Sequence, residues 1–516
     1  MKKILFILVF FSFPFASPKL SAQPPIQWQK CLGGDDSDSA TSTQQTSDGG
    51  YIVAGTTLSN NGDVSGNQGF FDFWVVKLDN LGAIEWEKTL GGSNHDLAST
   101  VRQTTDEGFI VVGVTESTDG DVLGNHGDKD AWVVKLSNMG VLEWQKALGS
   151  SGWDAANSIE LTVDGGFIIA GVASANDGDV SGNQGFQDFW VVKLNSSGAM
   201  EWQKSLGGTS DDYALSIKPT FDGGYIVVGE TLSNDGDVSG NNGNVDFWVV
   251  KLNSLGDIEW QNALGGGGLD VASDVVETTN GFVVCGYTGS HNSGDVTGHH
   301  SSLDYWIVKL AKTGELLWQK CYGGNNFDYA RSIVQTNDGM FLIAGEVKST
   351  DGDVEGNFGT QMIWVLKLNE LGGIVWKKIL GGTDGEGSGS IQQTNDNGYI
   401  LAGYSWSNDG DVSGNHGSSD FWIVKLSPGS TPTSTPLTQP LDIFPNPASH
   451  TITLQIASEE PTLSLFITDF LGRQISQHTI SNGESVDIAT LPTGLYLLTA
   501  TTPSGKVFSG KLRNQE

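Results

Sequence analysis

The loop motif Gly-Asp-Val recurs seven times and carries side chains that could bind a cation. Four residues after each Asp stands an Asn, replaced once by His299. Nine residues after it stands a second Asp, replaced once by Met362. In the first four copies these residues are Asp63, Asn67 and Asp72; Asp121, Asn125 and Asp130; Asp179, Asn183 and Asp188; and Asp237, Asn241 and Asp246. Because Ca²⁺ takes six to eight oxygen ligands, they are candidate calcium ligands, and no other cofactor is predicted.

A structural alternative explains the same residues. Asp and Asn fold back on their own backbone in tight turns, and the spacing is not that of an EF-hand loop. A second acidic series could cap a strand or bridge neighbouring repeats: Asp38, Asp96, Asp154, Asp212, Asp270, Asp328 and Glu386. The seven copies would then be the same type of turn formed once in each repeat. The sequence favours these structural turns and leaves calcium binding open.

No catalytic site is visible in the sequence. It contains neither a Gly-x-Ser-x-Gly elbow nor a His-Glu-x-x-His motif. Carboxylates are too abundant for a glycosidase pair to be selected, and near-identical loops argue against a catalytic site that breaks the repeat. The cysteines Cys31, Cys285 and Cys321 cannot all pair, so we expect buried small side chains rather than a disulfide scaffold.

Two tryptophan series reveal a repeat of 58 residues. The first series is Trp74, Trp132, Trp190, Trp248, Trp306, Trp364 and Trp422. The second is Trp28, Trp86, Trp144, Trp202, Trp260, Trp318 and Trp376. Together they take fourteen of the sixteen tryptophans. Self-similarity at such a period is typical of repeat architectures.

Each repeat reads as four β-strands. In the first full repeat the apolar and β-branched runs predict strands at Ala40–Thr46, Tyr51–Thr57, Asp72–Leu78 and Ile84–Leu90. Alternation of side chains places Trp74, Val76 and Leu78 opposite Ile84, Trp86 and Lys88. The same alternation predicts a cross-strand charge pair between Lys77 and Glu85.

The two ends of the repeat array are complementary. The chain after residue 22 begins with an unpaired fourth-type strand, Ile26–Lys30, and the array ends with a third-type strand, Asp420–Leu426, that lacks its partner. In a closed ring the first strand would pair with the last one, so that both unpaired strands gain a partner and the last four-stranded unit, or blade, is complete. The predicted fold class is therefore all-β, a seven-bladed β-propeller of four-stranded blades closed by the N-terminal strand, followed by a small C-terminal β-sandwich domain.

The repeats resemble the β-propeller repeats of secreted bacterial proteins, including the quinoprotein-like class with Gly-x-x-x-Trp in each blade. That element is Gly82-Ala-Ile-Glu-Trp86 here, and the resemblance covers about residues 26–426. It implies the fold and not the function, because propellers host many activities.

The net charge argues against two classes of partner, and the N-terminus indicates export. The net charge of −33 argues against binding to nucleic acids or anionic membranes. Lys2 and Lys3 precede an apolar stretch, residues 4–16, that is too short to span a bilayer. Ser21 and Ala22 permit cleavage before residue 23, which predicts a secretory signal peptide. No membrane span is expected in the mature chain.

The C-terminal tail resembles the type A sorting domain of the Bacteroidetes type IX secretion system. Its motif residues are Pro445, Asn446 and Pro447, then Asp469, Gly472 and Arg473, then Gly494 and Tyr496. The late basic residues Lys506, Lys511 and Arg513 follow. The resemblance implies export across the outer membrane by the type IX machinery, removal of the tail, and either release or surface attachment.

Four segments are expected: a signal peptide at 1–22, the propeller at 23–426, a Ser/Thr/Pro linker at 427–440, and the sorting domain at 441–516. The predicted function is a secreted or surface-displayed binding module for an extracellular glycan or protein, and a monomer is expected. The alternative is an extracellular polysaccharide-active enzyme that uses the propeller as its catalytic or accessory domain.

Overall fold

A computed structural model describes residues 23–428, 439–456, 462–469, 474–502 and 507–515. The predicted signal peptide, most of the predicted linker, Gly472, Arg473 and Lys506 lie outside them. All regular elements of the described residues are β-strands, which confirms the all-β prediction. The chain divides into two compact units, residues 1–429 and 430–516.

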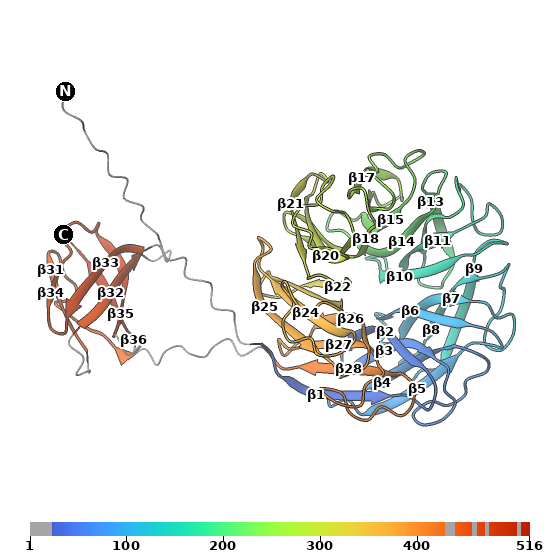
Figure 1. Ribbon diagram of the computed structural model, residues 1–516, viewed down its shortest axis with the longest axis horizontal. Helices are drawn as coiled ribbons and strands as arrows, with labels where there is room; N and C mark the ends of the chain where they lie inside the picture. Colours follow the sequence, from blue (N-terminus) through green and yellow to red (C-terminus); the bar gives the residue numbers. More distant parts are fainter. Residues whose placement is uncertain (1–22, 429–438, 457–461, 470–473, 503–506, 516) are drawn as a thin grey trace. The chain divides into compact units, whose positions relative to one another are not determined.

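The first unit holds seven four-stranded antiparallel sheets arranged around a central axis, as in a β-propeller (Figure 1). The first three sheets are β2 (Asp38–Gln45), β3 (Tyr51–Thr57), β4 (Asp72–Leu78), β5 (Ile84–Leu90); β6 (Asp96–Gln103), β7 (Phe109–Thr115), β8 (Asp130–Leu136), β9 (Leu142–Leu148); and β10 (Ala155–Leu161), β11 (Phe167–Ala173), β12 (Asp188–Leu194), β13 (Met200–Leu206). The next three are β14 (Asp212–Pro219), β15 (Tyr225–Thr231), β16 (Asp246–Leu252), β17 (Ile258–Leu264); β18 (Asp270–Thr278), β19 (Gly281–Thr288), β20 (Asp304–Ala311), β21 (Leu316–Tyr322); and β22 (Asp328–Gln335), β23 (Phe341–Val347), β24 (Met362–Leu368), β25 (Ile374–Leu380).

The seventh sheet joins the two ends of the repeat array. It consists of β26 (Glu386–Gln393), β27 (Tyr399–Ser405), β28 (Asp420–Leu426) and β1 (Ile26–Leu32), in that order. Leu32 pairs with Phe421, and the backbone N–H of Ser427 donates to the carbonyl of Pro25 at 2.9 Å. This sheet therefore combines segments almost the full length of the propeller unit apart.

The two central strands of each sheet carry most of the core. All residues of β3 and β4 are buried because neighbouring sheets cover both faces of these Val- and Ile-rich strands. Trp74 and its six counterparts at 58-residue spacing are at most 1% exposed. Rings contact across sheets, with centroids of Phe73 and Trp132 4.7 Å apart. Each sheet thus buries its apolar faces only against its neighbours.

A β-bulge corrects the predicted register of the two outer strands. The pairing shifts between Lys77 and Leu78, so Lys77 lies across from Trp86 rather than Glu85. Trp74, Val76 and Leu78 lie across from Thr89, Glu87 and Ile84. The charge pair still forms, because the long Lys77 side chain reaches Glu85 with an Nζ–Oε2 distance of 2.9 Å. A bulge adds one residue to one strand and shifts the pairing beyond it, so strict alternation along Ile84–Leu90 predicted the wrong partners.

The second unit contains two sheets around one hydrophobic core. The five-stranded sheet comprises β29 (Gln439–Pro440), β36 (Val507–Asn514), β35 (Gly494–Thr501), β32 (Thr462–Asp469) and β33 (Gln474–Ser481). The three-stranded sheet comprises β30 (Asp442–Phe444), β31 (Thr451–Gln455) and β34 (Ser485–Asp487). Both sheets contribute fully buried side chains, such as Ile452 and Leu465, to that core.

Candidate functional site

The candidate calcium ligands make hydrogen bonds to nearby backbone. Asp63 Oδ2 accepts the N–H of Gly33 at 3.3 Å. Asn67 donates to the carbonyls of Thr57 and Phe70 and accepts the N–H of Gly69 at 3.0 Å. Asp72 Oδ2 accepts the N–H of Gln68 at 2.8 Å. The other three predicted sets make the same kinds of hydrogen bond. Among the described residues, no group of three or more His, Cys, Asp or Glu side chains is placed to hold a metal ion.

The second acidic series caps the innermost strands. Asp38, fully buried, accepts the N–H of Gly34 at 2.9 Å and the hydroxyl of Ser59 at 2.9 Å. The hydroxyl of Thr57 donates to its other oxygen. Charge-assisted bonds of this kind compensate the burial of a carboxylate. The Asp38 series therefore fixes the turn that leads into each innermost strand.

The second Asp of each loop motif, Asp72 and its counterparts, has fewer hydrogen-bond partners than Asp38 has. Oδ1 is buried without a hydrogen-bond partner among the described residues in six copies: Asp72, Asp130, Asp188, Asp246, Asp304 and Asp420. A methyl group on Gly91 would lie 2.5 Å from Asp72 Oδ1 and 2.7 Å from Asp96 Oδ2, so both carboxyl groups face this glycine. Burial raises the pKa of Asp72 to about 7, and the charges of Asp96 and Asp121 add to the rise.

We expect the protein to be more stable at pH 5 than at pH 8. The folded-state pKa of Asp72 and Asp188 is about 7, and that of Asp246 about 6. The folded state therefore binds more protons than the unfolded state between about pH 4 and pH 7, and stability falls as pH rises through that window. Asp72→Asn keeps the acceptor for Gln68 and removes one titrating group. At pH 8 it should raise the melting temperature by roughly 1–4 °C.

Scanning calorimetry between pH 5 and pH 8 tests this expectation. Asp36→Asn is the matched control, because it removes one exposed carboxylate and should leave the pH dependence unchanged. Lower stability of Asp72→Asn at pH 8 would show that the charged form is stabilised. Calcium binding stays a prediction, and the same scans in Ca²⁺ and in EDTA test it. If the loops are structural turns, the two melting temperatures should agree at equal ionic strength.

The predicted charge pair is confirmed and extends to a second carboxylate. Lys77 Nζ lies 2.9 Å from Asp48 as well as 2.9 Å from Glu85, with its side chain 4% exposed. Lys135, Lys193 and Lys251 repeat the arrangement. Lys309 does not, because Asn280 and Leu317 occupy the carboxylate positions. Burial accordingly lowers the pKa of Lys309 to about 8. The repeat therefore differs from blade to blade in how well this buried charge is compensated.

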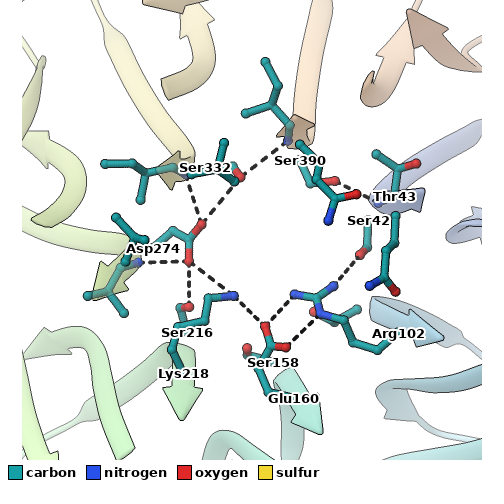
Figure 2. A pocket seen from close by; sticks show the side chains of 18 of the residues that line it. Ser42, Thr43, Arg102, Ser158, Glu160, Ser216, Lys218, Asp274, Ser332 and Ser390 are labelled. Carbon is teal, nitrogen blue, oxygen red and sulfur yellow. Dashed lines mark hydrogen bonds and ion pairs between the residues drawn. The ribbon is translucent and has the colours of Figure 1, made fainter. Parts of the chain in front are cut away.

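The principal cavity of the propeller unit lies on the central axis and measures about 870 Å³. The innermost strands of all seven sheets line it (Figure 2). Hydroxyl groups link neighbouring strands around it. Ser42 Oγ accepts the N–H of Val101 at 3.2 Å, and Ser390 Oγ accepts the N–H of Thr43 at 2.8 Å. These side chains are fixed by inter-sheet hydrogen bonds, which gives the cavity a rigid polar wall.

Charged residues break the symmetry of this wall on one side. Arg102 donates to both oxygens of Glu160, from Nε at 3.0 Å and from Nη2 at 2.8 Å. Lys218 Nζ lies 2.6 Å from Glu160 and 3.8 Å from Asp274. Figure 2 shows the four side chains as a continuous arc in the ring. The charges alternate, so the arc is internally neutral.

This pairing decides what the arc can do chemically. Burial alone would raise the pKa of Glu160, but the charges of Arg102 and Lys218 outweigh it and hold the pKa at about 2. A carboxylate with so low a pKa is a poor general acid or base near neutral pH. The arc therefore suits the binding and orientation of a polar ligand rather than proton transfer.

The sequence reading missed the arc, although a signal existed. Arg102, Glu160 and Lys218 are 58 residues apart and hence occupy one position in consecutive repeats. Alternating charge at a repeated position predicts contact between neighbouring blades. The motifs of the repeat are positions that stay constant from blade to blade, whereas this site consists of positions that vary.

The surroundings of the three cysteines disfavour the thiolate form. Cys31, Cys285 and Cys321 form no disulfide with one another. Cys31 and Cys285 are buried, and Cys321 is partly buried against the core. Burial raises the pKa of the Cys31 thiol to about 12 and the pKa of the other two well above the usual range. Thiols of this kind remain protonated at neutral pH and do not act as nucleophiles.

The motif residues of the tail hold its strands together. Asn446 donates to the carbonyl of Lys511 at 2.6 Å and accepts the N–H of Arg513 at 2.9 Å. The Tyr496 hydroxyl donates to the carbonyl of Pro492 at 2.7 Å. Pro445 and Pro447 flank Asn446, Gly494 begins β35, and Asp469 ends β32. Lys511 and Arg513 are exposed on the last strand.

Comparison with known families identifies the tail. Residues 442–512 match the family model of the secretion system C-terminal sorting domain. The predicted type IX sorting domain is thereby confirmed, and the protein is exported to the cell surface or beyond it. The sorting domain implies contact with the type IX secretion machinery. No helix among the described residues is long and apolar enough to cross a membrane.

Other similarities are weaker. The regulatory protein FlaEY of Caulobacter vibrioides is 29% identical over 143 residues, which are 26% of this chain and only 15% of that protein. The WD40 domain of Neurospora crassa Pan2 has a TM-score of 0.42 at 12% identity and covers 78% of this chain and 95% of its own. The Bombyx mori GH32 β-fructofuranosidase has a TM-score of 0.29 at 13% identity. The match covers 96% of this chain and 89% of that enzyme. We infer no activity from these matches.

Proposed function

We propose that the protein is a binding module that acts outside the cell, with its ligand site in and around the central cavity of the propeller. One observation carries this proposal: a rigid polar cavity of about 870 Å³ whose wall departs from the repeat on one side. Ligand sites are typically concave and carry a few placed polar groups. Export by the sorting tail supports the proposal, because glycans and proteins are the ligands that such a module would meet outside the cell.

The architecture that goes with this function is a seven-bladed propeller closed by β1. The pairing of β1 with β28 and the hydrogen bond between Ser390 and Thr43 support closure. We assign 1–22 to a secretory signal peptide, 23–426 to the propeller with quinoprotein-like repeats, 427–440 to a linker, and 441–516 to a β-sandwich sorting domain of Bacteroidetes type. A monomer without affinity for nucleic acids fits the acidic charge.

An array of extracellular glycans and surface proteins tests the proposal with the mature chain. We expect binding to at least one class of ligand, together with loss of that binding in Ser99→Trp, which fills part of the cavity from a lining position. Its melting temperature should stay near that of the parent protein. Absence of binding across the array would contradict the function. Hydrolysis of a polysaccharide panel would instead support the enzymatic alternative, for which the paired state of Glu160 is unfavourable.

A further inference from the structure

Aromatic and charged side chains gather on one side of the cavity, at the end where the innermost strands begin. We call this group the mouth cluster, and it consists of Tyr287, Tyr329, Arg331, Glu346, Tyr404 and Trp406. Its members come from β19, β22, β23, β27 and the residue after β27. Tyr329 lies across from Glu346 in the β22–β23 pair, and Arg331 follows two residues later at the cavity wall. Of the six residues Arg331 lines the cavity, and it joins the cluster to the cavity wall.

The six residues come from three neighbouring sheets, and the fourth repeat carries part of the set, with Tyr213 and Glu230 at the positions of Tyr329 and Glu346. In the first three repeats, small or aliphatic residues stand at the repeat position of Tyr329. Small or polar residues stand at the repeat position of Arg331. These residues are Ser39, Leu97 and Ala155 for Tyr329, and Thr41, Ser99 and Asn157 for Arg331. The repeat itself does not require these aromatic and charged groups. A part of the wall that departs from an otherwise constant repeat points to a specific ligand.

Arg331 lies beside a contacting pair of rings, Tyr287 and Tyr329, whose centroids are 4.9 Å apart. Its guanidinium carbon is 5.3 Å from the ring centroid of Tyr329 and 5.9 Å from that of Tyr287. Nε donates to Glu346 Oε2 at 3.0 Å, and Glu346 Oε1 accepts the N–H of Ser388 at 3.1 Å. The Arg331 side chain remains 42% exposed at the cavity. Its orientation is therefore fixed on one side while both Nη groups can bind a ligand.

Two aromatic rings of the cluster lie against glycine backbone. A Cβ atom on Gly387 would lie 2.3 Å from the Tyr404 ring, and one on Gly385 would lie 2.8 Å from the Trp406 ring. The two rings are 5.2 Å apart, and Trp406 is 47% exposed. The glycines thus allow one face of each ring to pack on the chain. Solvent reaches a large part of the Trp406 ring, so that part is free to contact a ligand.

We propose that the mouth cluster binds a saccharide that carries a carboxylate, such as a uronic acid residue. The electron-rich ring faces attract the C–H groups of a pyranose. The two Nη groups of Arg331 match a carboxylate as a bidentate fork. This assignment rests on the proposed binding function and names its ligand class. A protein partner fits less well, because a standard interface buries about 800 Å² on each side and the cluster is a small group at a cavity mouth.

Isothermal titration of the mature chain with trigalacturonic acid and with neutral cellotriose tests the assignment. We expect measurable binding of the uronate and at least tenfold weaker binding of the neutral sugar. Arg331→Gln should weaken uronate binding at least tenfold and leave the weak neutral binding unchanged. Trp406→Ala should weaken both. Lys204→Gln and Phe186→Ala are matched controls, because they change a cation and an exposed ring outside the cluster.

The possible outcomes separate the two proposals. Equal binding of neutral and acidic sugars, or uronate binding that survives Arg331→Gln, overturns the uronate assignment and leaves the binding function standing. Binding of proteins but of no saccharide on the array also overturns the uronate assignment and leaves the binding function standing. Failure to bind any saccharide or protein contradicts both proposals. Melting temperatures of the variants within about 2 °C of the parent protein establish that a loss of binding is not a loss of fold.

Discussion

Deletion of residues 23–32 should lower the melting temperature of the propeller by at least about 10 °C. The deletion removes β1, which buries Leu32 and Cys31 and covers β28, a strand with every residue buried. It also removes the hydrogen bond from Trp422 Nε1 to Gln29 Oε1 at 3.0 Å. Losing each Leu-sized burial costs roughly 1.5–3 kcal/mol, and the newly exposed edge of β28 invites aggregation.

Calorimetry and light scattering measure this effect. Leu32→Asp is the milder variant. It should lower the melting temperature by a smaller amount without shortening the chain. Deletion of residues 441–516 is the control, because that segment belongs to the second compact unit and should leave the propeller transition in place. A protein without β1 that melts together with the intact one would disprove closure by the N-terminal strand.

Removal of residues 441–516 should abolish surface appearance while the propeller still folds. The sorting domain acts as an address, so its loss should leave the protein in the periplasm of a cell with a type IX system. Protease accessibility on whole cells, compared with total protein by immunoblot, measures the distribution. We expect surface signal to fall to background with normal total amounts.

Point variants sharpen this second test. Asn446→Ala removes the two hydrogen bonds between the Pro-Asn-Pro turn and β36, and should reduce export strongly. Ser449→Ala is the matched control three residues away, since Ser449 bonds only to the adjacent His450 among the described residues. Surface levels of the truncated protein that equal those of the parent would show that export does not depend on the tail.

Constant features of the repeat were predictable, and variable ones were not. The tryptophan spacing led to the strands Tyr51–Thr57, Asp72–Leu78 and Ile84–Leu90 with the bounds that the structure gives. The innermost strand begins two residues earlier than predicted, at Asp38. A bulge between Ala40 and Ser42 interrupts its pairing, and the alternating pattern alone does not disclose such an insertion.

The candidate site was invisible for a related reason. Tyr329 and Glu346 are neighbours only through the register of β22 and β23, and Tyr404 joins them from another sheet. No local motif links these residues in the sequence. Their common placement follows only from counting repeat positions after the register of the strands is known.

The pairing of β1 with β28 also sets an order of events. Ile26 leaves the ribosome before its partner Leu426, which follows 400 residues later. At 5–20 residues per second this interval lasts roughly 20–80 s. Throughout it the first strand has no partner of its own, while finished blades expose an open side. Crowded chains can then exchange first strands, each completing the last blade of another. Strand-swapped oligomers are accordingly the misassembly to expect when the protein is produced at high concentration.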